Sequence, residues 1–258
     1  MSLAHGAEIV KREGVTQDAF LGGRLAIAQP ARGFRAGLDS VLLGAAIDPS
    51  CEALLDLGAG VGTAALVALA MNPAAYATLL ESDPEMAALA SENLISNGLA
   101  TRGKVLTLDL TGPGKARAEA GIASDHYASI IANPPFFEAG TSPAATRAAA
   151  RHMSAEALDS WVKTAATHAA PGGEIIFIHV AERLPALLKS FDSRFGAITI
   201  LPLTPREGEP AHRVLIRAIK GSRAPLTLLA TRALHTMTGR DFRPEFEAIF
   251  RGQDRLHW

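Results

Sequence analysis

An Asn-Pro-Pro-Phe tetrad that begins at Asn133 has the composition of a site that handles an amino group. The two prolines, Pro134 and Pro135, restrict the backbone and remove two N–H donors, so the carbonyl oxygens of this segment stay available as acceptors. The side-chain oxygen of Asn133 and the carbonyl oxygen of Pro134 can each accept one proton of an exocyclic amino group, which draws the nitrogen lone pair out of ring conjugation. Phe136, with Phe137 next to it, is placed to stack on a flat substrate. The tetrad therefore predicts a site for a planar amino nitrogen, in which positioning and fixed dipoles carry the chemistry.

A second segment, from Asp56 to Thr63, is rich in glycine and lies between a predicted strand and a predicted helix. Its glycines, Gly58, Gly60 and Gly62, allow a ligand to approach the backbone closely at the N-terminus of the helix. The spacing is Gly-x-Gly-x-Gly, and Thr63 stands where the dinucleotide-binding fingerprint has its third glycine. The segment therefore predicts a nucleotide-like cofactor and disfavours a nicotinamide dinucleotide.

Two further acidic residues, Glu81 and Asp109, each follow one of the next predicted strands. Glu81 lies 19 positions after Gly62, where a carboxylate can accept hydrogen bonds from both ribose hydroxyls of an adenosine. Asp109 is expected to meet the adenine amino group, and the alternative is that this short acidic residue only caps a turn. With Asp56, these residues place an acidic side chain after each of three successive strands, an order that resembles class I methyltransferases.

Short apolar runs alternate with segments of helical periodicity from residue 53 onward, which is typical of a parallel sheet covered on both faces by helices. Residues 137–153, rich in Ala, Thr, Ser and Pro, are predicted to form a loop or lid after the tetrad. Ligands of such sheets bind at the carboxyl edge of the strands, so we expect the glycine-rich segment and the tetrad to share one edge. The predicted strands are 53–57, 76–80, 105–108, 127–132, 174–180, 198–203 and 213–219, and the predicted helices are 63–71, 84–97 and 154–170.

The composition bounds the class of protein. The chain has 258 residues, 48% of them hydrophobic, which allows a sizeable core. Its single cysteine, Cys51, and its eight histidines show no metal-ligand spacing, which predicts no metal site and a reducing compartment, by default the cytoplasm. No apolar run approaches the roughly 20 residues of a membrane helix, so no membrane partner is expected. Residues 183–258 carry 13 Lys or Arg against 7 Asp or Glu, which fits an anion-binding surface or an ordinary solvated face.

Further segments narrow the interpretation: TQDAFLGGR at 16–24, QP at 29–30, FRAGLDSVLL at 34–43 and KGSRAP at 220–225. Together with the tetrad they resemble the bacterial tRNA1(Val) adenine-N6-methyltransferase family over nearly the whole chain. The resemblance implies a Rossmann-like class I α/β fold with a mostly parallel seven-stranded sheet, helices on both faces and an antiparallel terminal strand. It also implies S-adenosylmethionine as cofactor and, as substrate, the 6-amino group of an adenine beside the tRNA anticodon. Phe136 stands where many relatives have tyrosine, which preserves stacking and loses a hydroxyl.

The resemblance also suggests roles outside the two motifs. Asp39 is expected at the cofactor site, with Arg35 as a further candidate. Residues 1–45 are expected to form a segment that covers cofactor and substrate, and residues 46–258 the methyltransferase domain as a single structural unit. Contacts to RNA phosphates are expected from basic residues beside the tetrad and in the C-terminal part, namely Arg147, Arg151, Arg206, Arg213, Lys220 and Arg223.

Two alternatives to an RNA methyltransferase stay open. A protein glutamine methyltransferase acting on a release factor would use the same tetrad, because an amide nitrogen poses the same electronic problem. A non-catalytic protein that binds the cofactor or RNA would keep the fold, although intact Asp56, Glu81 and Asn133 argue against lost activity. The oligomeric state is left undetermined by the sequence.

Overall fold

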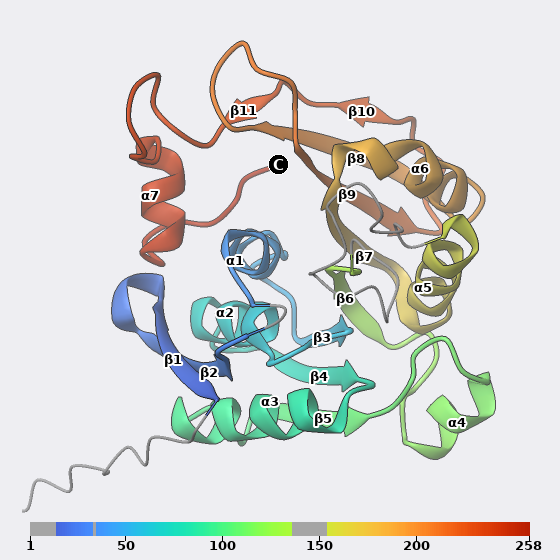
Figure 1. Cartoon of the computed structure of the whole chain (residues 1–258). Helices are drawn as coiled ribbons and strands as arrows, with labels where there is room; N and C mark the ends of the chain where they lie inside the picture. Colours follow the sequence, from blue (N-terminus) through green and yellow to red (C-terminus); the bar gives the residue numbers. More distant parts are fainter. Residues whose placement is uncertain (1–13, 33–34, 136–153) are drawn as a thin grey trace, which may run out of the picture.

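The computed structural model describes residues 14–32, 35–135 and 154–258, and its centre is a mostly parallel β-sheet (Figure 1). The strands of this sheet are β3 (Ala53–Leu57), β4 (Tyr76–Glu81), β5 (Gly103–Thr107), β6 (Tyr127–Ala132), β7 (Ala169–Val180), β8 (Phe195–Thr204), β9 (Arg213–Lys220), β10 (Thr227–Leu228) and β11 (Arg232–Ala233). Their order is β10-β8-β9-β7-β6-β3-β4-β5, and β11 also pairs with β8. Strand β9 runs antiparallel to both of its neighbours. The fold class is thus the one expected from the sequence.

Helices cover both faces of the sheet (Figure 1). They are α1 (Leu38–Ala45), α2 (Thr63–Met71), α3 (Pro84–Ser96), α4 (Gly114–Glu119), α5 (Ala155–His168), α6 (Leu184–Asp192) and α7 (Pro244–Phe250), with two 3-10 turns at Leu21–Gly23 and Ala181–Arg183. Asp83 caps the N-terminus of α3, because its carboxylate accepts hydrogen bonds from the backbone N–H of Glu85 and Met86. In the described ranges no helix combines the length and the hydropathy needed to cross a bilayer.

The strand order places a topological switch point between β3 and β6. From β3 the chain adds β4 and then β5 on one side, and it returns to the other side of β3 for β6 and β7. The loops after β3 and β6 therefore diverge at the carboxyl edge of the sheet, where open α/β sheets form their ligand clefts. Both motifs singled out in the sequence follow these two strands, so the topology brings them together.

The structure departs from the sequence expectations in a few elements. The seven expected long strands are present, and β10 and β11 extend the edge beside β8 as strands of two residues each, too short for a periodic pattern. Helix α5 ends at His168 rather than near residue 170, and β7 begins at Ala169, ahead of Pro171-Gly172-Gly173. The pairing of β6 with β7 shifts register between Tyr127 and Ser129, which accommodates that extra segment.

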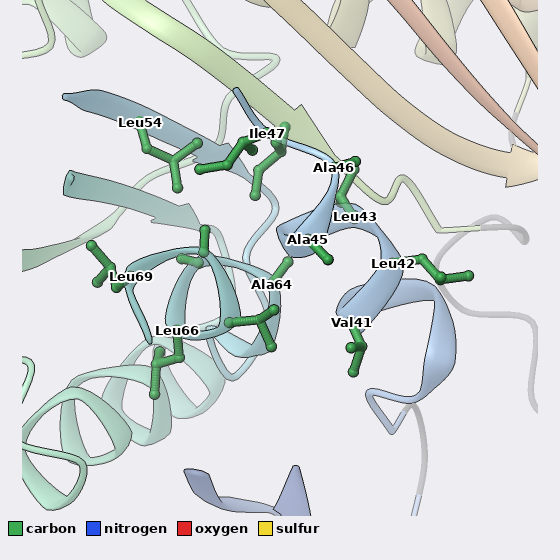
Figure 2. Close-up of a cluster of buried hydrophobic side chains, with 14 of the residues drawn as sticks. Val41, Leu42, Leu43, Ala45, Ala46, Ile47, Leu54, Ala64, Leu66 and Leu69 are labelled. Carbon is green, nitrogen blue, oxygen red and sulfur yellow. The ribbon is translucent and has the colours of Figure 1, made fainter. Parts of the chain in front are cut away.

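The core lies on both faces of the sheet, and neighbouring strand residues contribute to opposite sides. Leu54 packs with helices α1, α2 and α3, whereas Leu55 and Leu57 pack with α5 and α6. Helix α2 is apolar on nearly every side because α1 covers the face that the sheet does not (Figure 2). The two helices approach closely at Gly44, where a Cβ would lie 2.3 Å from the carbonyl oxygen of Ala64.

An N-terminal hairpin, β1 (Val15–Phe20) with β2 (Leu25–Pro30), is attached to the main body through α3. The Asn93 side-chain amide accepts from the N–H of Ala28 at 2.8 Å and donates to its carbonyl oxygen at 2.9 Å. Asn97 bonds both backbone groups of Ala26 in the same way, at 2.9 Å each. The two amides replace a third strand for β2, so the hairpin is held beside the cleft by hydrogen bonds as well as by its buried Leu25 and Ile27.

Candidate active site

A cleft of about 490 Å³ lies at the carboxyl edge of β3, β4 and β6. Its walls come from the loops that follow these strands, from the β5–α4 loop, from the start of α1 and from α5. The lining residues are Ala36, Ser40, Asp56, Gly58, Ala59, Gly60, Val61, Ala64, Glu81, Ser82, Asp83, Met86, Asp109, Leu110, Thr111, Asn133, Pro135 and Trp161. The glycine-rich segment, both following acidic residues and the start of the tetrad therefore face one cleft, as the sequence predicted.

The glycine-rich loop needs glycine for two different steric reasons. A Cβ on Gly58 would lie 2.2 Å from the ring of Trp161, and a Cβ on Gly62 would lie 2.9 Å from the side chain of Leu79. Both residues also have positive φ, at 65° and 84°. Gly60, by contrast, has φ of 57° but faces open space, so its missing side chain leaves room within the cleft. The loop is thus shaped by Trp161 on one side and by the sheet on the other.

Glu81 is held in place by the loops around it. Its Oε2 accepts a hydrogen bond from the Gly60 N–H at 2.7 Å, and its Oε1 accepts from the Asp83 N–H at 2.8 Å. The Ser82 hydroxyl also donates to Oε1, at 3.3 Å. A carboxylate offers about four lone-pair positions, so one remains for a hydroxyl donor of a ligand. Because two backbone donors fix the carboxylate, its position is set before any ligand binds.

Asp56 is the most perturbed acid of the cleft. Its side chain is 2% exposed and accepts one hydrogen bond, at 3.2 Å from the N–H of Ala65 in the first turn of α2. Burial raises the pKa of Asp56 to about 8, the bond from Ala65 opposes this rise, and the nearby Glu81 carboxylate adds to it. At neutral pH without a positive charge nearby, Asp56 therefore holds a proton. A cationic group of a ligand placed in the cleft would favour its ionised form.

The β5–α4 loop, which carries Asp109, is fixed from behind by a buried arginine. Arg117 Nη1 donates at 2.7 Å to the carbonyl oxygens of Leu110 and Gly112, and Arg117 Nε lies 3.2 Å from His168 Nε2. Because the guanidinium only donates, His168 Nε2 accepts and its Nδ1 donates to the Ala123 carbonyl oxygen at 2.9 Å. Burial first, and then the charge of Arg117, lower the pKa of His168. The loop is therefore tied to α5 through a neutral histidine.

Asp109 itself sits in a turn. Its Oδ1 accepts from the N–H of Thr111 at 2.8 Å and from the Thr111 hydroxyl at 2.7 Å. The turn-cap role considered from the sequence is thus present. Asp109 also lines the cleft, so the turn and a ligand contact are compatible.

Asn133, at the start of the tetrad, lines the cleft. The Asn133 Oδ1 atom is buried and has no hydrogen-bond partner among the described residues. Pro135 lines the cleft and Pro134 is buried beneath it. A buried amide oxygen without a partner is costly unless a ligand satisfies it. Phe136 and Phe137 lie outside the described residues.

Other residues predicted for the site are placed elsewhere or fall outside the description. Asp39, expected at the cofactor, pairs with Arg213 at 2.9 Å and is not one of the lining residues. Lys220 donates to Asp125 Oδ1 and to the carbonyl oxygens of Ala166 and Ala169, all within 2.9 Å, at the amino edge of the parallel strands.

The expected phosphate contact of Lys220 is therefore not supported, because its three N–H groups already have structural partners. Arg223 is exposed near the same amino edge, away from the cleft. Arg206 bonds the Gly239 carbonyl oxygen at 2.7 Å and has Glu209 beside it. Arg147 and Arg151 lie outside the described residues.

Sequence reasoning missed several lining residues, chiefly Trp161, Met86 and Ser40. Trp161 is 8% exposed and belongs to the apolar face of α5. The helical periodicity of the sequence shows which residues of α5 are buried. It does not show whether a buried tryptophan packs on the glycine-rich loop or in the core. Ser40 is two residues past the start of α1, next to the Asp39 that the sequence resemblance favoured.

Three comparisons with known proteins agree on the class. Residues 38–202 match the model of the methyltransferase small domain. A tRNA1(Val) (adenine(37)-N6)-methyltransferase of Aeromonas hydrophila is 32% identical over 72% of this chain and 77% of its own length. One named alike from a Flavobacteriaceae bacterium is 31% identical over 50% of this chain, and the match spans about half of that relative.

A solved structure from Agrobacterium tumefaciens, described as a predicted O-methyltransferase, is 31% identical. It superimposes with a TM-score of 0.73 over 84% of this chain and 98% of its own. The family match covers more than half of the chain. The chain therefore belongs to the methyltransferase small-domain family, together with the bacterial tRNA1(Val) adenine-N6-methyltransferases, and it is a methyltransferase.

Proposed function

We propose that this protein transfers a methyl group from S-adenosylmethionine to the exocyclic 6-amino group of an adenine in RNA, in the anticodon loop of a tRNA. The observation that carries the proposal is made at Asn133, which lines the cleft and whose buried Oδ1 atom has no hydrogen-bond partner among the described residues. Asn133 is placed at the end of β6, next to the glycine-rich loop after β3. An amino donor in the cleft satisfies this acceptor and is oriented by it.

The cleft fits the proposed cofactor. S-adenosylmethionine supplies an electrophilic methyl group on a sulfonium, together with an adenosine and a charged amino-acid end. Glu81, held by two backbone N–H groups and the Ser82 hydroxyl, has one acceptor position left for a ribose hydroxyl. Asp109 and Leu110 line the part of the cleft that we assign to the adenine. The open space at Gly60 lets the cofactor approach the backbone of the glycine-rich loop. The buried Asp56 carboxyl is suited to a cationic group, because a positive charge offsets the burial that raises its pKa.

Asn133 and the Pro134 carbonyl distinguish a nitrogen from an oxygen as the methyl acceptor. An amino group has two protons and can donate to both acceptors, whereas a hydroxyl has one proton and leaves one acceptor unsatisfied. Pulling both protons into fixed hydrogen bonds localises the nitrogen lone pair toward the methyl donor, and in-line transfer then needs no protein nucleophile. The site therefore supports N-methylation even though one structural neighbour is described as a predicted O-methyltransferase.

RNA is favoured as the substrate by the names of the relatives, each described as acting on adenine 37 of a tRNA. An adenine in a loop is unpaired or easily splayed, so inserting it into the cleft costs less than extracting one from a duplex. Asn133-Pro134-Pro135 then meets the edge of the flipped base.

The proposal is tested by mass spectrometry of the nucleosides of total tRNA from cells with and without the gene. Loss of 6-methyladenine in the deletion strain, and its return with the wild-type protein but not with Asn133→Ala, is the expected result. An unchanged nucleoside profile, combined with methylation of a release-factor glutamine by the purified protein, would assign the activity to the protein substrate instead. Failure of the purified protein to bind S-adenosylmethionine in calorimetry would indicate a non-catalytic protein.

A further inference from the structure

A second cleft of about 490 Å³ opens beside the first, between the N-terminal hairpin, the start of α1 and the region of α7. Figure 1 shows α7 next to the β1–β2 hairpin, although the two are separated by most of the chain. The lining residues are Asp18, Ala19, Phe20, Leu21, Gly22, Gly23, Gln29, Arg35, Ala36, Gly37, Leu38, Val41, Phe242 and Phe250. Ala36 lines both clefts, so the two clefts adjoin at this residue.

Aromatic rings form much of the wall of this second cleft. Phe242 packs edge-on against Phe250, with ring centroids 4.6 Å apart, and His235 stacks on Phe242 at 4.7 Å with an interplanar angle of 22°. Phe20 is half-buried in the same cleft, and Leu38 is 38% exposed within it. Partly exposed rings beside an open space suit a flat heteroaromatic group, because stacking requires only a π-face.

Asp18 supplies a carboxylate to the wall of this cleft, beside the polar side chains of Gln29 and Arg35. Gln29 Nε2 donates to Asp18 Oδ2 at 2.6 Å, and Arg35 Nη2 donates to the same oxygen at 2.5 Å. Gln29 is 2% exposed and is itself fixed by accepting from the Ala36 N–H at 2.9 Å. The other oxygen, Asp18 Oδ1, has no hydrogen-bond partner within the described ranges. Because a carboxylate only accepts, this oxygen selects a donor.

We propose that the second cleft binds the nucleobase adjacent to the methylated adenine, and that Asp18 selects a base with an exocyclic amino group over uracil. The proposal rests on the RNA function proposed above. The two clefts adjoin at Ala36. A polynucleotide whose target base enters the first cleft has its neighbouring base unstacked by the flip, and the second cleft is the adjoining space for that base. An amino group donates to Oδ1, whereas the one N–H on uracil's pairing edge lies between two carbonyl oxygens that repel the carboxylate.

The orientation of the Asp18 carboxylate makes a conservative substitution diagnostic. In Asp18→Asn the side-chain oxygen must stay at the Oδ2 position, because Gln29 and Arg35 both donate there. The amide NH2 then replaces Oδ1, so the acceptor that Gln29 and Arg35 leave free on this cleft-lining residue becomes a donor. The variant is therefore expected to favour uracil, whose carbonyl oxygens accept, over a base that presents an amino group. Asp192→Asn, at an exposed position at the end of α6, is the matched control.

The experiment measures kcat/KM for methylation of stem-loop RNAs that keep the target adenine. The nucleotide on each side of the target is changed in turn to adenosine, cytidine, uridine or an abasic site. For one of the two sides, the wild-type protein and Asp192→Asn should prefer adenosine and cytidine over uridine by roughly tenfold, the effect expected of one hydrogen bond to a charged group. Asp18→Asn should reverse this preference, and the abasic site should raise KM for wild type.

The outcomes separate this inference from the proposed function. Methylation of all these RNAs by the wild-type protein with no preference on either side would overturn the second-cleft assignment, and adenine methylation would stand. The assignment would also be overturned if Asp18→Asn remains folded and keeps the wild-type preference. The assay of the wild-type protein on the RNAs with different neighbouring bases requires no substitution in the protein. The inference can therefore be tested even if Asp18→Asn is unstable. Absence of methylation on every RNA would refute the proposed function itself and the second-cleft assignment with it.

Discussion

The buried Asp56 carboxyl makes the stability of this protein depend on pH in a direction opposite to that of most acidic residues. Its pKa is about 8 in the folded chain, against 3.8 for an unperturbed aspartate. Between these values the folded state holds a proton that the unfolded state has released, so the free energy of unfolding falls as the pH rises. The contribution is complete below about pH 4 and is lost by about pH 8.

The perturbation that isolates this effect is Asp56→Asn. The amide keeps an oxygen for the Ala65 N–H and resembles the protonated acid in shape, but it does not titrate. One proton corresponds to about 1.4 kcal/mol per pH unit, so between pH 5 and pH 8 wild type should lose roughly 3–4 kcal/mol relative to the variant. Wild type and Asp56→Asn should therefore have similar stability only below about pH 4, and the variant should be the more stable by roughly 1–2 kcal/mol at pH 5 and by a larger margin at pH 8.

Urea denaturation followed by tryptophan fluorescence measures this difference, because Trp161 packs directly on the glycine loop that follows Asp56 and urea leaves the ionic strength unchanged. Scans at half-unit steps from pH 5 to pH 8 give the two stability curves. Titration of His168 and of all other groups is common to both proteins and cancels in the difference. The exposed Asp192→Asn serves as control and should follow wild type. Parallel curves for wild type and Asp56→Asn would refute the conclusion that Asp56 is protonated in the folded state.

Further substitutions test the remaining parts of the site. Asn133→Ala should lower kcat by roughly 10²–10³-fold, the effect of removing one preorganised polar group from a reacting centre, while calorimetry shows cofactor affinity unchanged; retained kcat would exclude the acceptor role. Gly58→Ala should cost about 1–3 kcal/mol more in urea unfolding than Gly60→Ala, because both residues have positive φ but only a Cβ at Gly58 meets the Trp161 ring. Equal losses would mean that backbone strain alone matters. Arg117→Gln should raise the calorimetric Kd for S-adenosylmethionine roughly tenfold, since the β5–α4 loop loses two hydrogen bonds from a charged group. With the cofactor at saturation kcat should stay at the wild-type value, and a loss of kcat there would contradict a role limited to positioning.

Local patterns in the sequence were enough to predict the helices and strands and the order of the loops that carry the acidic residues. The short apolar runs and the segments of helical periodicity were sufficient to predict the long strands and helices α2, α3 and α5, because these patterns depend on neighbouring residues. The glycine spacing and the acidic residues after successive strands placed Asp56, Glu81 and Asp109 at one edge of a parallel sheet, and the structure has all three in one cleft. Parallel strands align their carboxyl ends, so sequence order alone was enough for this step.

Only the tertiary structure decided what each charged or aromatic side chain meets. Lys220 was expected from the sequence to contact RNA, yet its N–H groups bind Asp125 and two carbonyl oxygens at the far edge of the sheet. The contact between Trp161 and Gly58 could not be predicted from the sequence. Helical periodicity identifies the buried face of a helix but not the residues that pack against it. The second cleft is built from segments more than 200 residues apart, and no local pattern records such a meeting. Long-range packing sets these contacts, and it depends on the whole chain at once.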